Sequence, residues 1–299
     1  MGSRHIGLSS PGAGVRIDAH QHFWNFDPAR HAWITEEMSL LKRDFLPVDL
    51  LPELEANGID ASVAVQAEQS EEETRFLLRL AENNSRIAGV VGWVDLRSPD
   101  VEKRLGNFSD HKKLRGFRHI AQSEPDDRFL ASAAFVRGMS KLAAFGFSYD
   151  ILIYPRQLAA ARELAERLPE QRFVIDHLAK PDIKNGANQK EWAHHMRAIA
   201  QNGNVFCKIS GLVTEADWVS WKTDDFREYL DVVFDAFGTD RLLFGSDWPV
   251  CLLAASYRRV KQIVEEYVAG QADTGKEKIF GENAVRFYNF PVSAHGSAD

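Results

Sequence analysis

Short runs of β-branched and aromatic residues recur along the whole chain, separated by longer stretches rich in Ala, Leu, Glu and Arg. The short runs predict eight strands, at residues 16–19, 61–66, 88–94, 114–119, 148–153, 172–176, 205–209 and 241–244. The longer stretches predict helices at residues 47–57, 71–83, 99–108, 127–145, 155–168, 189–201 and 224–237. Strands that alternate with helices in this way indicate an α/β protein with a parallel sheet.

Eight strand–helix units fit a closed (β/α)8 barrel of the TIM type better than an open doubly wound sheet. An open sheet normally has fewer strands and a glycine-rich phosphate turn, and no Gly-x-Gly-x-x-Gly follows any predicted strand. The 299 residues could form one barrel or two ordinary domains, but neither a linker nor an internal repeat is visible. We therefore predict one barrel over residues 15–290, with a flexible N-terminal extension at 1–14 and a flexible tail at 291–299.

Composition limits the partners and the location of the protein. Acidic residues outnumber basic ones by 43 to 36 and no long basic run occurs, which argues against a nucleic-acid partner. The apolar stretches are too short to cross a bilayer, so no membrane association is expected. The two cysteines, Cys207 and Cys251, lie in apolar runs without a disulfide pattern, which predicts a reduced, cytoplasmic protein. The oligomeric state is not indicated.

Four residues at the predicted strand ends form a candidate metal site. His20 and His22 follow the first strand, and their spacing places both imidazoles on one side of an extended segment. His177 follows the sixth strand and Asp247 the eighth, and catalytic groups of such barrels lie at the carboxyl ends of strands. Imidazoles with one carboxylate are the donor set of a catalytic zinc that keeps a position open for water.

Each of these residues also has a structural explanation. The two histidines could anchor a loop by hydrogen bonds, His177 could bond to Asp176, and Asp247 could cap a helix. Their chain order and common position at the barrel mouth favour the functional interpretation. A carboxylate beside a metal-bound water can accept its proton, so we assign Asp247, together with His177, to catalysis.

Further polar and aromatic residues at strand ends are candidates for substrate binding: Trp24, Glu68, Trp93, Arg118, His119, Tyr154 and Lys208. The glutamate could instead be an additional metal ligand or the solvated start of a helix. The cationic and phenolic groups could bind a carbonyl or carboxylate, or form structural ion pairs. The tryptophans could form apolar walls for a sugar ring, or pack in the core.

Other catalytic classes find no support. The Gly-x-Ser-x-Gly motif of serine hydrolases is missing, because Ser246 is followed by Asp247 and Trp248, and no Walker loop is present. The remaining rival from another class is a non-catalytic sugar-binding barrel, in which the same polar residues only hydrogen-bond a ligand.

Five segments together resemble the lactonase branch of the amidohydrolase superfamily: residues 17–24 (IDAHQHFW), 65–70 (VQAEQS), 116–119 (GFRH), 176–181 (DHLAKP) and 243–249 (LFGSDWP). The likeness spans nearly the whole chain, and residues 281–284 (GENA) resemble the family's closing helix. It implies hydrolysis of a sugar lactone, of the L-fuconolactone or L-rhamnonolactone kind, to its aldonic acid. His20, His22, His177 and Asp247 match the family's active-site positions. A hydrolase or decarboxylase of another small carboxylated substrate, of the pyrone or muconolactone type, is the alternative.

The resemblance also limits the metal content. Two-metal amidohydrolases carry a bridging carbamylated lysine, which has no counterpart at the end of the fourth strand, where Arg118 and His119 stand. At most one divalent ion is therefore expected, with zinc the first choice. Some relatives in this branch hydrolyse lactones without a metal, so the need for the ion is open. The choice among sugar lactones, and between 1,4 and 1,5 rings, depends on loop geometry that the sequence does not reveal.

Overall fold

A computed structural model describes residues 14–271 and 275–291. Eight parallel strands form one sheet in which each strand pairs with the next, from β1 to β8. The strands are β1 Ile17–Gln21, β2 Ala61–Val65, β3 Ile87–Gly92, β4 Leu114–His119, β5 Ser148–Ile151, β6 Phe173–Ile175, β7 Val205–Ile209 and β8 Leu242–Phe244. Every predicted strand is present, with its ends within two residues of the prediction. The expected (β/α)8 architecture is confirmed.

The barrel closes where the two ends of the sheet meet. The backbone N–H of Asp247 donates to the carbonyl of His20 at 2.8 Å, and the N–H of His22 donates to the carbonyl of Trp248 at 2.7 Å. The buried Asp18 carboxylate joins the same seam, because it accepts from the backbone N–H of Ser246 at 2.9 Å. Residues at opposite ends of the sequence are thereby fixed side by side at the carboxyl end of the barrel.

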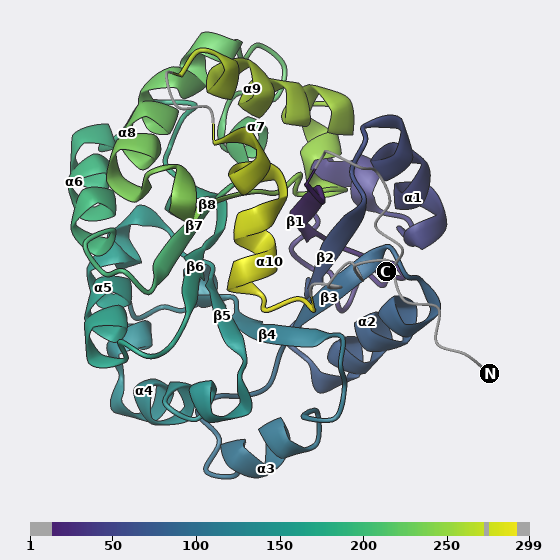
Figure 1. Ribbon diagram of the computed structural model, residues 1–299, viewed down its shortest axis with the longest axis vertical. Helices are drawn as coiled ribbons and strands as arrows, with labels where there is room; N and C mark the ends of the chain where they lie inside the picture. Colours follow the sequence, from purple (N-terminus) through teal and green to yellow (C-terminus); the bar gives the residue numbers. More distant parts are fainter. Residues whose placement is uncertain (1–13, 272–274, 292–299) are drawn as a thin grey trace, which may run out of the picture.

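Helices surround the strands in Figure 1: α1 Pro47–Ala56, α2 Glu71–Asn83, α3 Val101–Gly106, α4 Ala133–Met139, α5 Leu158–Arg167, α6 Gln189–Ile199, α7 Leu212–Glu215, α8 Arg227–Phe237, α9 Tyr257–Ala269 and α10 Asn283–Phe287. The predicted long helix at 127–145 is wrong. Ser132 has extended backbone angles (φ −62°, ψ 143°), which separate α4 from a preceding 3-10 turn. Helix α9 was not predicted, although Ser256 caps it by accepting from the N–H of Arg259.

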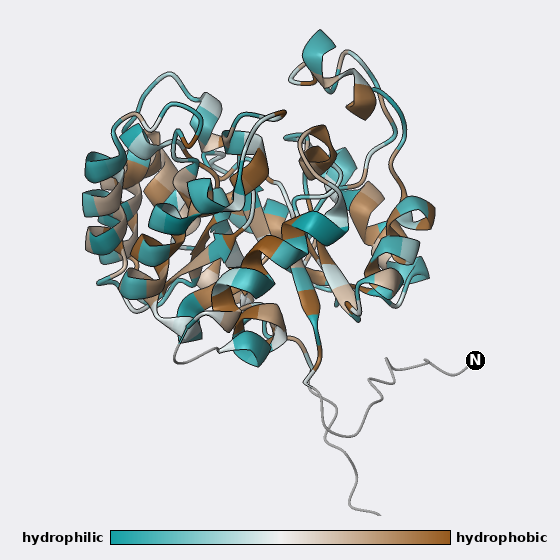
Figure 2. Cartoon of the chain, turned by 90° about the horizontal axis from the view of Figure 1, so that it is seen from above, coloured by the Kyte–Doolittle hydropathy of each residue, from teal (hydrophilic) through white to brown (hydrophobic). Residues whose placement is uncertain are grey.

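Two apolar cores hold these layers together. The larger core lies between the sheet and the helices, and Figure 2 shows hydrophilic and hydrophobic residues alternating along the helices, as expected for helices with one buried face. The smaller core fills the barrel and includes Phe206 of β7 together with Phe287 and Tyr288 of the C-terminal segment. Helix α10 lies across one end of the barrel in Figure 1. The other end, formed by the carboxyl ends of the strands, carries the candidate site.

Three other sequence-based predictions concern the ends, the cysteines and the membrane. The extension and tail predicted as flexible fall mainly on residues 1–13 and 292–299, which lie outside the described part. Cys207 and Cys251 are buried and unpaired. Within residues 14–271 and 275–291, no helix combines the length and apolar character that a membrane span requires.

Candidate active site

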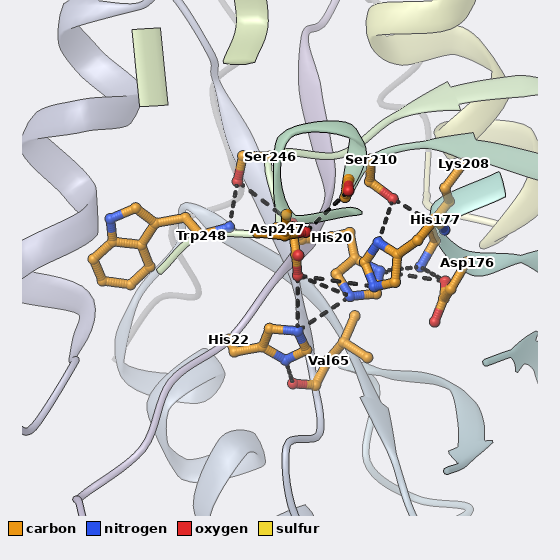
Figure 3. A network of polar contacts seen from close by, with 12 residues as sticks. His20, His22, Val65, Asp176, His177, Lys208, Ser210, Ser246, Asp247 and Trp248 are labelled. Carbon is orange, nitrogen blue, oxygen red and sulfur yellow. Dashed lines mark hydrogen bonds and ion pairs between the residues drawn. The ribbon is translucent and has the colours of Figure 1, made fainter. Parts of the chain in front are cut away.

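The four predicted metal ligands converge on one point at the barrel mouth. Figure 3 shows the three imidazole rings directed at the Asp247 carboxylate. The Oδ1 atom of Asp247 lies 3.4 Å from Nε2 of His22 and 3.8 Å from Nε2 of both His20 and His177. The Nε2 atoms of His20 and His22 are 3.2 Å apart. All four side chains are nearly or fully buried.

These separations fit a single metal ion. Tetrahedral Zn²⁺ with nitrogen and oxygen ligands at about 2.0–2.1 Å places those ligands roughly 3.4 Å from one another. The His20, His22 and Asp247 side chains offer ligand atoms within 4.8 Å of one another, and His20, Asp176 and His177 form a second such group. Glu68, considered as an additional ligand, belongs to neither group among the described residues. The structure therefore contains a site that can hold one divalent ion.

Hydrogen bonds orient two of the imidazoles for metal binding. His22 donates from Nδ1 to the carbonyl of Val65 at 2.7 Å, which leaves the lone pair of Nε2 free. The Nδ1 atom of His177 is 2.9 Å from the Ser210 hydroxyl, which can hold that ring in the same tautomer. Burial lowers the pKa of His20 and His177 well below the ordinary value, so both rings are neutral near pH 7.

Burial alone would raise the pKa of Asp247, but the His177 and His22 side chains outweigh burial and hold that pKa below its usual value. The carboxylate is therefore ionised near neutral pH. An anionic carboxylate beside neutral imidazoles can both bind a cation and accept a proton.

An unusual backbone run places His177. The four consecutive residues His177 to Lys180 all have positive φ, between 51° and 57°. A left-handed conformation costs roughly 1–2 kcal/mol for each residue with a Cβ atom, and such runs are rare outside functional sites. Gly211 permits the arrangement, because a Cβ atom at Gly211 would lie 2.7 Å from Nδ1 of His177. Asp247 is also left-handed, with φ 58°.

A buried ion network lies beneath the ligands. Lys208 of β7 is fully buried, and its Nζ atom is 2.5 Å from Asp150, 3.0 Å from Asp176 and 3.1 Å from Nδ1 of His20. Arg118 of β4 lies 3.0 Å from the other oxygen of Asp176. Burial would raise the pKa of Asp176, but the Lys208, His20 and Arg118 side chains hold it well below its ordinary value. The network thus fixes the ring of His20 through ionised neighbours.

The network buries two cations that were predicted to contact a substrate. Lys208 is fully buried, and Arg118 is 3% exposed and also bonds Gln66. His119 is 2% exposed, with Nε2 bound to Glu124 at 2.6 Å and Nδ1 accepting from the indole of Trp93 at 3.2 Å. Protein partners contact the polar nitrogens of all three groups, apart from Nε of Arg118, which has no hydrogen-bonding partner among the described residues.

The other predicted substrate-binding residues lie in different surroundings. Trp24 is 1% exposed and its indole N–H donates to the carbonyl of Arg43, so it packs within the loop that follows β1. Glu68 is half-buried and lines a cleft of about 170 Å³ together with Phe23 and His31. Trp93 and Tyr154 are half-buried, which leaves part of each ring open to a ligand.

Several residues of the site were not predicted from the sequence, or were given no role. Asp150, Asp176 and Ser210 hold other site residues in place, and Lys180 with Glu215 forms an ion pair near Asp247. Asp176, Lys180 and Ser210 do follow predicted strands, so position was an available signal. No signal in the sequence marked Asp150 or Glu215, because the residues that they contact come from other strands and loops.

The Ser210 contact leads to a testable expectation for metal affinity. Replacing Ser210 with Ala should weaken Zn²⁺ binding about 10- to 100-fold, because His177 loses the partner that orients its ring. Competition with a chromophoric chelator measures this affinity. Ser220→Ala is the matched control, since that hydroxyl donates to Asp217 on an exposed loop. Equal affinities for the two variants would contradict the orienting role.

The barrel and its cluster of imidazoles and carboxylate define a metal-binding (β/α)8 enzyme with its site at the carboxyl ends of the strands. The sequence profile of the family described as "Amidohydrolase" matches residues 17–290. The chain belongs to this family.

Relatives and a solved structure agree with this assignment. The chain is 42% identical to L-fucono-1,5-lactonase of Burkholderia multivorans (strain ATCC 17616 / 249), over 94% of this chain and 98% of that protein. It is 37% identical to L-fucono-1,5-lactonase of Burkholderia ambifaria, over 91% and 95% of the two chains. A crystal structure of an amidohydrolase from Burkholderia multivorans with bound zinc superposes with a TM-score of 0.89 and 42% identity, covering 93% of this chain and all of that one.

Proposed function

We propose that this protein hydrolyses a sugar lactone, of the L-fuconolactone type, to its aldonic acid. One observation carries the proposal: the Asp247 carboxylate faces the imidazoles of His20, His22 and His177 at the barrel mouth. The chain that holds them is 42% identical to an L-fucono-1,5-lactonase along nearly its whole length. A lactone is a cyclic ester, so its opening requires a water nucleophile, a base and stabilisation of the carbonyl oxygen.

Asp247 is the proposed base. It takes a proton from water as the water oxygen adds to the lactone carbonyl carbon, and the π electrons of the C=O bond move to the carbonyl oxygen. When the C=O bond re-forms, the bond from this carbon to the ring oxygen breaks, and Asp247 returns the proton to that oxygen. The product is a hydroxy acid, which ionises and releases one proton to the solution.

His20, His22, His177 and Asp247 would hold the metal, and we propose zinc because nitrogen and carboxylate ligands at these separations suit it. Such an ion lowers the pKa of bound water and polarises a carbonyl. The relative's structure with bound zinc supports the choice of ion. We further propose that hydrolysis does not strictly need the metal, because Asp247 is already ionised.

A pH-indicator assay over a panel of 1,4- and 1,5-aldonolactones tests the function. Turnover of L-fuconolactone or a near analogue is expected, and no turnover of any lactone would refute the proposal. The same assay after chelation, with metal content measured in parallel, tests the metal. Complete loss of activity that returns only with Zn²⁺ would show that the ion is required.

The rivals differ in measurable ways. A decarboxylase would release CO₂, and a non-catalytic sugar-binding barrel would bind lactones without opening them. The 42% identity to an L-fucono-1,5-lactonase over nearly the whole chain favours lactone opening over both. The cytoplasmic location and the lack of a nucleic-acid partner remain predictions.

A further inference from the structure

The opening of a lactone places negative charge on the carbonyl oxygen, and the predicted partners for this charge are not available. Arg118, His119 and Lys208 are each at most 3% exposed, and protein groups contact all of their polar nitrogens except Nε of Arg118, which is buried without a partner among the described residues. A catalytic donor must reach the position of the oxyanion, about 2.7–3.1 Å away. A more exposed cation at the barrel mouth is better placed to meet this charge, alongside any bound metal.

Lys180 meets this requirement among the described residues. It ends the left-handed run that begins at His177, so one loop after β6 carries both a metal-site imidazole and this ammonium. The side chain of Lys180 is 20% exposed, and its Nζ atom lies 3.2 Å from Oε1 of Glu215 and 5.9 Å from the ring centre of Tyr154. It is thus accessible yet held in place.

The charge of Lys180 acts on the proposed base. Burial alone would lower the pKa of Lys180, but the carboxylates of Glu215 and Asp247 raise it, so the group stays a cation. In return, the ammonium contributes to lowering the pKa of Asp247 and of His177. Glu215, the partner of Lys180, ends α7, which begins directly after Ser210 and Gly211, and both of these residues lie against His177, so the ion pair borders the site.

The ammonium also has unused hydrogen-bonding capacity. A lysine carries three N–H donors. Within the described part of the chain, the Lys180 ammonium has Glu215 as its hydrogen-bonding partner. Two donors therefore remain for a ligand. Lys184, in the same loop, differs: it is 57% exposed and pairs with the exposed Asp217 at 3.3 Å.

We propose that Lys180 binds the carbonyl oxygen of the lactone and stabilises the negative charge that forms on it, while Glu215 positions the ammonium. This inference rests on the proposed function. The step is the one described above: water adds to the carbonyl carbon, its proton moves to Asp247, and the electron pair moves to the oxygen facing Lys180. After ring opening, Lys180 faces the carboxylate of the aldonate.

Steady-state kinetics of Lys180→Met test the proposal. We expect kcat to fall about 10²- to 10³-fold while KM changes by less than about threefold, because the contact strengthens in the transition state. The affinity for the aldonate product should also fall, as measured by calorimetry. Lys184→Met is the matched control and should keep wild-type kinetics, since it removes a lysine of the same loop that faces solvent.

Two further measurements separate this role from a structural one. Ethylammonium added to Lys180→Ala should restore part of the lost kcat, which a structural lysine would not allow. Lys180→Gln provides a second neutral variant, judged by the same kinetics if Lys180→Met does not fold.

A kcat within threefold of wild type in either neutral variant would overturn the proposal. So would a loss of activity without rescue and with unchanged affinity for the aldonate. Failure of the wild-type protein to open any lactone would instead refute the proposed function itself, and this inference with it.

Discussion

Replacing Asp247 with Asn is expected to lower kcat/KM for the best lactone by at least about 10³-fold while the protein stays folded. General base catalysis contributes roughly 10²- to 10⁴-fold, and an amide cannot accept the proton of the attacking water. The backbone bond from Asp247 to His20, which closes the barrel, is unaffected by the change. The pH-indicator assay measures the loss, and circular dichroism measures the fold.

Asp224→Asn serves as the control, because Asp224 is 88% exposed and pairs with a surface arginine. It should retain full activity. A value of kcat/KM for Asp247→Asn above about one tenth of the wild-type value would be incompatible with Asp247 as the base.

Lys208→Met should destabilise the protein by about 3–5 kcal/mol, because the change leaves buried carboxylates without their counter-charge. Lys208 lies between Asp150 and Asp176, and all three side chains are fully buried. Tyr288 also donates to Asp150, at 2.9 Å, but a neutral hydroxyl does not replace an ammonium. Urea unfolding, followed by fluorescence and circular dichroism, measures the change in the free energy of unfolding.

Two comparisons make this measurement specific. The double variant Lys208→Met/Asp150→Asn should recover part of the lost stability, since it removes one of the unpaired charges. Lys141→Met, which breaks a pair with the exposed Glu102 at 2.9 Å, should cost about 1 kcal/mol or less. Equal losses for Lys208→Met and Lys141→Met would show that the buried network does not stabilise the fold.

The sequence allowed the barrel and the meeting of His20, His22, His177 and Asp247 at its mouth to be predicted, because each depends on local pattern. An apolar run of four to six residues between helical stretches marks a strand, wherever its neighbours lie. Barrel topology then brings the ends of all strands to one mouth, so His20 and Asp247 could be expected to meet without a model of the loops.

The contacts beneath and beside the site could not be predicted, because they depend on which inward-facing residues share a level in the barrel. Lys208 was expected to face a substrate, but register places it between Asp150 and Asp176. The left-handed run from His177 to Lys180 has no sequence signal, since none of its residues is glycine. The extended backbone at Ser132 likewise divides a stretch whose composition favours a continuous helix.

The backbone hydrogen bonds between β1 and the segment after β8 also determine when, during synthesis, the active site can form. The ribosome delivers His20 and His22 before the other strands of the barrel, and Asp247 after β8. Until the segment after β8 emerges and bonds the backbone of His20, a nascent chain presents the imidazoles without Asp247. The ability to open a lactone with Asp247 as the base therefore arises only when synthesis of the barrel is almost complete, and a chain truncated before β8 would lack it.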